Sequence, residues 1–131
     1  MLPPSAAEAL RARVRQRCLS FPGTSERARN SAHSAFLVKD RTFCYFLNDH
    51  HGDGVVGVTL KALPGVQGAL VDMDPRRFYL PAYMHRHGWV GVRLDVEPLD
   101  WDQVDQLLAE AYAASAPKAL LRQYQARPVP S

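Results

Sequence analysis

Arginine and aromatic side chains are interspersed over residues 76–93, around the last two predicted strands of the chain. A guanidinium group can bind phosphate through two parallel hydrogen bonds, and an exposed aromatic ring can stack on a base. This combination predicts a protein surface that binds nucleic acid weakly, mainly by contacts with the phosphate backbone of the nucleic acid. Tyr83 and Trp89 would stack or wedge, while the cations would contact phosphate. The predicted contact residues are Lys39, Arg76, Arg77, Tyr83, Arg86, Trp89 and Arg93.

The alternation within Trp89–Leu94 assigns these side chains to the two faces of a strand, because residues two apart share a face. The aliphatic set, which we expect to face the core, is Val90, Val92 and Leu94. Trp89 and Arg93 then lie on the outer face or at the sheet rim. A competing interpretation is that Trp89 caps the core and that the arginines form ion pairs. Their acidic partners would be Asp72, Asp74 or Asp95.

The turn between the same two strands, Tyr79–Trp89, indicates an alternative function. Its aromatic residues could form a pocket for a small ligand or for a segment of another protein, with no nucleic acid involved. The two functions differ in their physics. Binding to phosphates weakens steeply with salt, whereas binding in an aromatic pocket is nearly independent of it.

Histidines occur in two places that invite comparison with a metal site: the loop Asn48–Gly54, which contains His50-His51, and the pair His85 and His87. Imidazole and carboxylate groups bind divalent ions such as Zn²⁺. Adjacent histidines rarely bind one ion, however, and a loop rich in Gly, Asp and Asn is an ordinary turn. We therefore expect no metal and no cofactor.

The sequence offers no motif for catalysis, since it has no GxSxG, HExxH, P-loop or GxGxxG pattern. His33 lies near Ser31 and Ser34, but a catalytic triad is defined by geometry and not by proximity in sequence. We expect His33 to satisfy a hydrogen bond at a strand edge. The chain is therefore predicted to be a binding protein and not an enzyme.

The chain has 131 residues, of which 47% are hydrophobic and 22% charged, so we expect one domain over residues 1–131. No apolar run approaches the roughly 20 residues that cross a bilayer, and the first residues lack a signal-peptide pattern. We expect a cytoplasmic protein without a membrane partner. A monomer is favoured, although no residue pattern specifies the oligomeric state. Cys18 and Cys44 are expected to be reduced and buried.

Charge is distributed unevenly along the sequence. The formal net charge is +3, and thirteen of the sixteen basic residues are arginine. Residues 95–110 hold six acidic residues and no basic one, so the rest of the chain is more basic than the net charge indicates. This distribution is compatible with a polyanionic partner, and equally with a solvated surface that has none.

Hydrophobic periodicity predicts an α+β fold, an antiparallel sheet with helices packed on one face and the other face open. Helices are expected from a Ser5 cap to about Cys18, over Leu63–Met73, from an Asp100 cap, and from Ser115 and Pro117. The expected strands are Glu26–Asn30, Ala35–Val38, Thr42–Leu47, Val55–Leu60, Arg76–Leu80 and Trp89–Leu94. We expect a tight hairpin connection at Lys39–Arg41 and a frayed tail at Arg127–Ser131.

Short motifs follow one another with characteristic spacing from about Phe21 to Leu121. They are Pro22–Glu26, His33–Phe36, Asp49–Gly54, Pro64–Gln67, Asp74–Phe78, Gly88–Asp95, Asp100-Trp101 and Ala116–Lys118. Together they resemble the MmcQ/YjbR family. The resemblance implies a frataxin-like (CyaY-like) fold, with an N-terminal helix, β-hairpins and two C-terminal helices, and DNA as a possible partner. It does not imply iron binding, because fold alone does not carry function.

The chain departs from the family pattern in one turn. Leu80–His85 resembles a Pro-Pro-Tyr-x-Gly turn in which the second Pro and the Gly are replaced. A function tied to the shape of this turn is therefore not implied by the resemblance.

Overall fold

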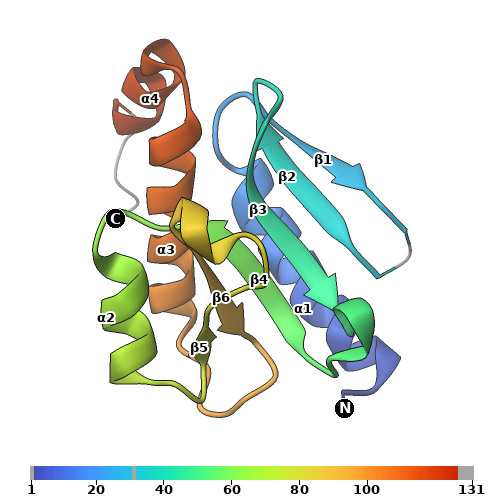
Figure 1. Ribbon diagram of the computed structural model, residues 1–131. Helices are drawn as coiled ribbons and strands as arrows, with labels where there is room; N and C mark the ends of the chain where they lie inside the picture. The colour runs from blue at the N-terminus through green and yellow to red at the C-terminus, as the bar shows by residue number, and fades with distance from the viewer. Residues whose placement is uncertain (1, 31, 127–131) are drawn as a thin grey trace.

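The computed structural model describes residues 2–30 and 32–126, and the predicted tail Arg127–Ser131 lies outside them. Within these ranges the chain forms six strands and four α-helices (Figure 1). The strands are β1 Thr24–Ala28, β2 Ser34–Val38, β3 Arg41–Asn48, β4 Val56–Lys61, β5 Phe78–Tyr79 and β6 Trp89–Arg93. The α-helices are α1 Pro4–Leu19, α2 Val66–Met73, α3 Trp101–Ser115 and α4 Lys118–Gln125. Two short 3₁₀ helices, η1 His50–Gly52 and η2 His85–His87, lie in loops.

The strands form one antiparallel sheet in the order β1-β2-β3-β4-β6-β5. Helices α1 and α3 pack against one face of this sheet, and α2 lies beside β5 at one edge (Figure 1). The opposite face carries none of the four α-helices, and we refer to it as the open face. The predicted α+β class, with helices packed on the sheet, is confirmed.

The core forms where the apolar side of the sheet meets α1 and α3. Residues that pair across neighbouring strands point to the same side of a sheet, so they form rows. One row on the helix side is Phe36, Cys44, Leu60 and Val90, and another is Phe46, Val58, Val92 and Phe78. The helices contribute Val14, Cys18, Leu108 and Tyr112, among others. The predicted core side of β6 is confirmed, since Val90, Val92 and Leu94 are buried.

Cys18 of α1 and Cys44 of β3 are free and buried in this core, as predicted. Burial raises the pKa of the Cys44 thiol, and the hydrogen bond with the Cys18 thiol acts in the same direction. Cys44 therefore acts as a small packing group and not as a reactive thiolate.

The two ends of α3 confirm one prediction and correct another. Asp100 is the N-cap, and its carboxylate accepts a hydrogen bond from the Gln103 backbone N–H at 3.2 Å. Ser115 does not start the next helix, because it is buried in the last turn of α3. Ala116 is extended, as expected for a residue that precedes proline, and Pro117 is the N-cap of α4.

The start of α1 also differs from the prediction. Pro3 is the N-cap and Pro4 is the first helical residue, so Ser5 lies inside the helix and does not cap it. Proline is favoured in the first turn because its missing N–H would have no partner there. None of the helices in residues 2–30 and 32–126 is long and apolar enough to cross a membrane.

Two predicted strands differ from the observed ones because turns replace their ends. The strand predicted at Glu26–Asn30 is β1, two residues earlier, and the Asn30 side-chain oxygen accepts two backbone N–H groups in the turn that follows. The strand predicted at Arg76–Leu80 shrinks to β5. Its first residues belong to a turn in which the Asp74 carbonyl accepts the backbone N–H groups of Arg77 and Phe78. The other four predicted strands agree with the structure to within one residue.

Candidate functional site

The residues predicted to contact nucleic acid are divided between the two ends of the sheet. In the register of β6 on β4, Arg93 pairs with the second residue of β4 and Trp89 with the last. Arg76, Arg77 and Arg93 lie at one end, because the Arg93 N–H donates to the Arg77 carbonyl. The hairpin residue Lys39 and the η2 residue Arg86 lie at the other end, beside the starts of β3 and β6. These cations therefore do not form one continuous patch.

Two of the predicted contact residues are buried, which corrects the expectation that their side chains are exposed to a partner. Arg77 is 6% exposed; its guanidinium donates to the Pro98 carbonyl and forms an ion pair with Asp74 at 3.5 Å. Trp89 does point to the open face, but it is only 7% exposed, and its ring centroid lies 5.7 Å from that of Tyr45. The ion pair of Arg77 with Asp74 agrees with the competing interpretation. Trp89 lies on the outer face, as first predicted, and does not cap the core.

The other arginines at the Arg93 end are also engaged. Arg93 donates two hydrogen bonds to the Asp95 carboxylate, at 2.9 and 3.1 Å. These hydrogen bonds are the main reason that the pKa of Arg93 is raised. Arg76 is exposed but donates to the Glu97 carbonyl at 2.8 Å. The predicted contact residues that the structure leaves exposed without such a bond are Lys39, Tyr83 and Arg86.

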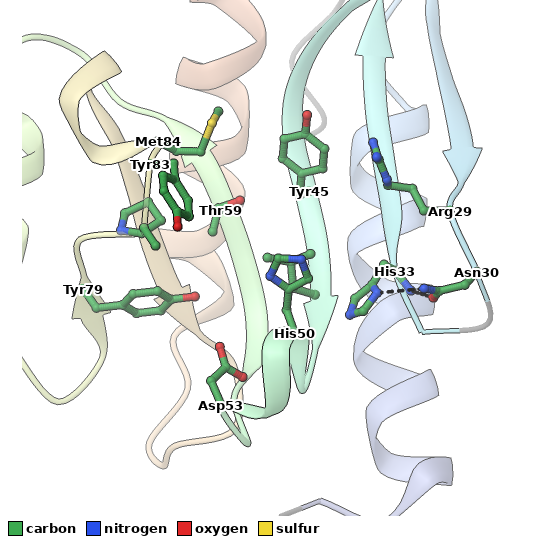
Figure 2. A pocket seen from close by; sticks show the side chains of 13 residues that line it. Arg29, Asn30, His33, Tyr45, His50, Asp53, Thr59, Tyr79, Tyr83 and Met84 are labelled. Atoms are coloured by element: carbon green, nitrogen blue, oxygen red, sulfur yellow. Dashed lines mark hydrogen bonds between the residues drawn. The ribbon is translucent and has the colours of Figure 1, made fainter.

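A cavity of about 830 Å³ lies on the open face (Figure 2). Tyr79 and the loop Pro81–Met84 line one side of it, and Arg29 and His33 line the other. The loop that joins β3 to β4 adds residues from one end, and the strands β3 and β4 lie between the two sides. Its volume is within the range of sites for small organic ligands.

The cavity exists because the open face has small residues between large ones. One row across the strands is Tyr45, Thr59, Gly91 and Tyr79. The Tyr79 ring lies directly over Gly91, since a Cβ added at Gly91 would overlap its ring atoms. Tyr45 and Tyr79 therefore flank Thr59, which lies at the bottom of the hollow.

Thr59 gives the hollow a polar floor. Its side chain lines the cavity although the residue is only 4% exposed, and its hydroxyl makes no hydrogen bond within the described residues. The hydroxyl is not among the buried side-chain atoms that lack a hydrogen bond, so it is open to the solvent in the cavity. A ligand atom could therefore bond to this hydroxyl without displacing a protein partner.

Tyr79 supplies a hydroxyl that stays protonated. Burial raises the pKa of Tyr79 to about 12, and the nearby Asp53 carboxylate also raises it. At neutral pH the side chain can therefore donate a hydrogen bond from a position against the sheet.

His33 is held in one tautomer on the opposite side. The Asn30 side-chain oxygen accepts the backbone N–H groups of Ala32 and His33, which turns its amide NH₂ toward His33 Nδ1 at 3.1 Å. Nδ1 therefore accepts, and Nε2 donates to the Asn48 carbonyl at 3.1 Å. Both ring nitrogens are used in anchoring strands, as predicted, and the ring packs edge-on against His50, with centroids 5.2 Å apart.

Arg29 brings a positive charge to the same side. Its backbone N–H donates to the His33 carbonyl, which continues the β1–β2 pairing beyond the strand. Its side chain lines the cavity, is exposed, and forms no ion pair within the described residues. The site thus combines aromatic rings, a hydroxyl that is open to the cavity, and a cation without an ion-pair partner among the described residues.

Comparison with known proteins identifies the family of the chain and a solved structure with the same fold. The family model YjbR matches residues 19–114, a span that contains every residue lining the cavity. The chain belongs to the YjbR family. A solved structure, the Deinococcus radiodurans protein DR2400 with the domain DUF419, aligns with a TM-score of 0.66 at 21% identity. The alignment covers 86% of this chain and 85% of that one, and at this identity it shows a shared fold. No curated protein matches the chain.

The turn that departs from the expected YjbR pattern is one wall of the cavity. Tyr83 adopts a left-handed backbone conformation with φ 66°, which is uncommon for a bulky residue, and its side chain is 76% exposed. Gln67 of α2 holds the turn from behind, since its side-chain NH₂ donates to the carbonyls of His85 and Trp89. The turn is therefore fixed at one end and presents an aromatic ring at the other.

The histidines of this YjbR-family protein at His50-His51, His85 and His87 carry imidazole groups of the type that binds metal ions. Within residues 2–30 and 32–126, no group of three or more His, Cys, Asp or Glu residues is placed to hold a metal ion. The His50 ring instead packs against His33 beside the cavity.

The turn Tyr79–Trp89, which the sequence proposed as a pocket, contributes one side of the cavity, but most of the other lining residues were not predicted. It did not assign Tyr45, Thr59 or Arg29 to a pocket. A signal was present, because Tyr45 and Thr59 are the residues that interrupt the apolar pattern of β3 and β4. Alternation gives the face on which such a residue lies, but it does not say that the two residues pair with each other.

Proposed function

We propose that this YjbR-family protein binds a small ligand with a planar ring in the open-face cavity, and that its role is binding rather than catalysis. The observation that carries the proposal is the row across the sheet in which Tyr45 and Tyr79 flank Thr59, whose hydroxyl is open to the cavity. Aromatic rings supply contact area, and the hydroxyl supplies direction. A mostly apolar hollow with a few convergent polar groups is the usual form of a ligand site.

The proposal predicts the result of a fragment screen followed by NMR. Aromatic fragments should shift the backbone amide signals of Tyr45, Thr59 and Gly91 in ¹⁵N-labelled protein. Tyr45→Ala should weaken the affinity of such a fragment about tenfold, because loss of a stacking ring costs about 1–3 kcal/mol. Met73→Ala, an exposed apolar position at the end of α2, is the matched control and should bind as the wild type does.

Shifts confined to other surfaces, or equal affinities for wild type and Tyr45→Ala, would contradict the assignment of the site. The same spectra of the free variant show whether Tyr45→Ala is folded. A weakened affinity therefore cannot be confused with loss of structure.

Nucleic acid is the second candidate ligand. One observation favours its binding on the open face of the sheet, and not at the sheet ends where the predicted contact residues lie. Arg27 and Arg29 are both exposed, and strand alternation places them on the open face beside the ring of Tyr45. Cations next to an aromatic ring on a sheet are suited to a single strand, whose phosphates and bases they would contact.

Fluorescence anisotropy with labelled single- and double-stranded DNA tests this second candidate. We expect preference for the single strand, and a log–log salt slope of about −0.7 per phosphate contacted. Arg27→Ala/Arg29→Ala should remove the binding, whereas Arg76→Ala/Arg86→Ala should leave it in place. The reverse result would restore the predicted sites at the sheet ends, and no binding at low salt would reject nucleic acid.

A further inference from the structure

We infer that the ligand of the open-face cavity is an aromatic ring joined by a short spacer to an acid group, with Arg29 as the residue that binds the acid. The inference rests on the proposed function, because it presupposes that the cavity binds a ring. Beyond the proposed function, the inference specifies that the ligand is negatively charged and which way it is oriented in the cavity.

The first argument is the uncompensated charge on the β1 side of the cavity. Arg29 lines the cavity, and Arg27 lies two residues before it on the same face. Neither forms an ion pair within the described residues. The only acid of β1, Glu26, points to the helix side, where it accepts hydrogen bonds from Arg15 at 2.7 Å and from Ser34 at 2.6 Å. The cations of this side are therefore left for a ligand or for solvent.

The second argument is the polarity of the cavity as a whole. Asp53 lines it at the loop between β3 and β4 and acts electrostatically on Tyr79, which lies on the side away from Arg29. Arg93, a cation that also acts electrostatically on Tyr79, is neutralised by its bidentate contact with Asp95. An acid group is therefore attracted to the Arg29 side and repelled from the Asp53 end, so the charges fix one orientation of the ligand.

The third argument is distance. Arg29 extends the line of β1 and Thr59 lies on β4, so three strand spacings of about 4.8 Å separate their backbones. The Arg29 side chain spans part of this gap. A ring that occupies the hollow over Thr59 therefore reaches Arg29 only if its acid group is carried on a spacer. The phosphate of a mononucleotide and the carboxylate of an aromatic acid with a short aliphatic chain share this chemistry, whereas benzoate is too short.

Titration followed by ¹H–¹⁵N NMR with five probes tests the inference. Adenosine 5′-monophosphate and indole-3-butyrate carry both ring and acid, adenosine carries only the ring, ribose 5-phosphate carries only the acid, and benzoate lacks the spacer. We expect one or both of the ring-acid probes to bind at the amides of Thr59 and Gly91, and to bind more tightly than the other three. Which of the two binds distinguishes a phosphate from a carboxylate.

Arg29→Gln should weaken the better ring-acid probe about tenfold, since a charge-assisted hydrogen bond is lost, and should leave adenosine unchanged. Arg122→Gln, an exposed arginine of α4, is the matched control. Equal binding of adenosine and the ring-acid probes, or no effect of Arg29→Gln, would overturn the inference that the ligand carries an acid group. The proposed binding of a ring in the cavity would still stand. If no probe shifts the cavity amides, both are overturned.

Discussion

Replacing Tyr112 by alanine should lower the free energy of unfolding by about 3–5 kcal/mol, the usual cost of removing a fully buried aromatic ring. Tyr112 is completely buried in α3. Its ring stacks on Phe21 with centroids 4.6 Å apart and meets Phe43 edge-on at 5.9 Å. Its hydroxyl donates to the Pro22 carbonyl at 2.7 Å. The side chain thus ties α3 to β3 and to the turn that follows α1.

Urea denaturation followed by circular dichroism gives the measurement. Tyr112→Phe is the matched control, because it keeps the ring and removes only the hydroxyl. We expect it to cost about 1 kcal/mol, the net value of a typical hydrogen bond. Similar midpoints for the alanine variant and the wild type would show that this aromatic cluster does not hold α3 to the sheet.

The second large effect is expected at Gly91, where alanine should displace the Tyr79 ring from the sheet. The added Cβ would overlap that ring, so either the ring swings into solvent or the backbone shifts. We expect a loss of about 1–3 kcal/mol of stability, as for other additions to a filled site. The ring also forms one side of the cavity, so the variant should lose affinity for any ligand bound there.

The pKa of Tyr79 reports this displacement directly. In the wild type, burial holds the Tyr79 pKa at about 12, so an alkaline titration followed by the NMR signals of the Tyr79 ring should show late ionisation. The unfolded chain ionises near pH 10, and it therefore binds fewer protons than the folded chain between about pH 10 and 12. This contribution to stability is complete below pH 10 and is lost as the pH rises toward 12. In Gly91→Ala the late step should move toward pH 10.

Gly68→Ala is the control for this experiment. Gly68 lies within α2, where an added Cβ meets no atom within 4 Å, so alanine should be neutral or slightly stabilising there. An unchanged Tyr79 titration in Gly91→Ala would mean that the backbone of β6 moves in place of the ring. The cavity would then be more adaptable than its geometry indicates.

The basic and aromatic residues of 76–93 show how far a charge pattern can be interpreted without a fold. The pattern predicted one nucleic-acid surface, yet Arg77 and Arg93 bond to neighbouring groups at one end of the sheet and Trp89 is buried at the other. Each of these arginines has an acid within three residues in sequence, Asp74 for Arg77 and Asp95 for Arg93. The local sequence therefore allowed ion pairs as readily as an exposed surface, and only the tertiary structure decides between them.

Local sequence determined the class of fold, four of the six strands to within one residue and the N-cap of α3, because alternation, helical periodicity and capping act over a few residues. It also determined which face each β6 residue takes, and its motifs identified the YjbR family. Tertiary structure decided the candidate site. Tyr45, Thr59, Gly91 and Tyr79 come from four strands, and they meet only because the order β3-β4-β6-β5 and its register place them in one row. Strand order and register depend on contacts between distant segments, which no local pattern encodes.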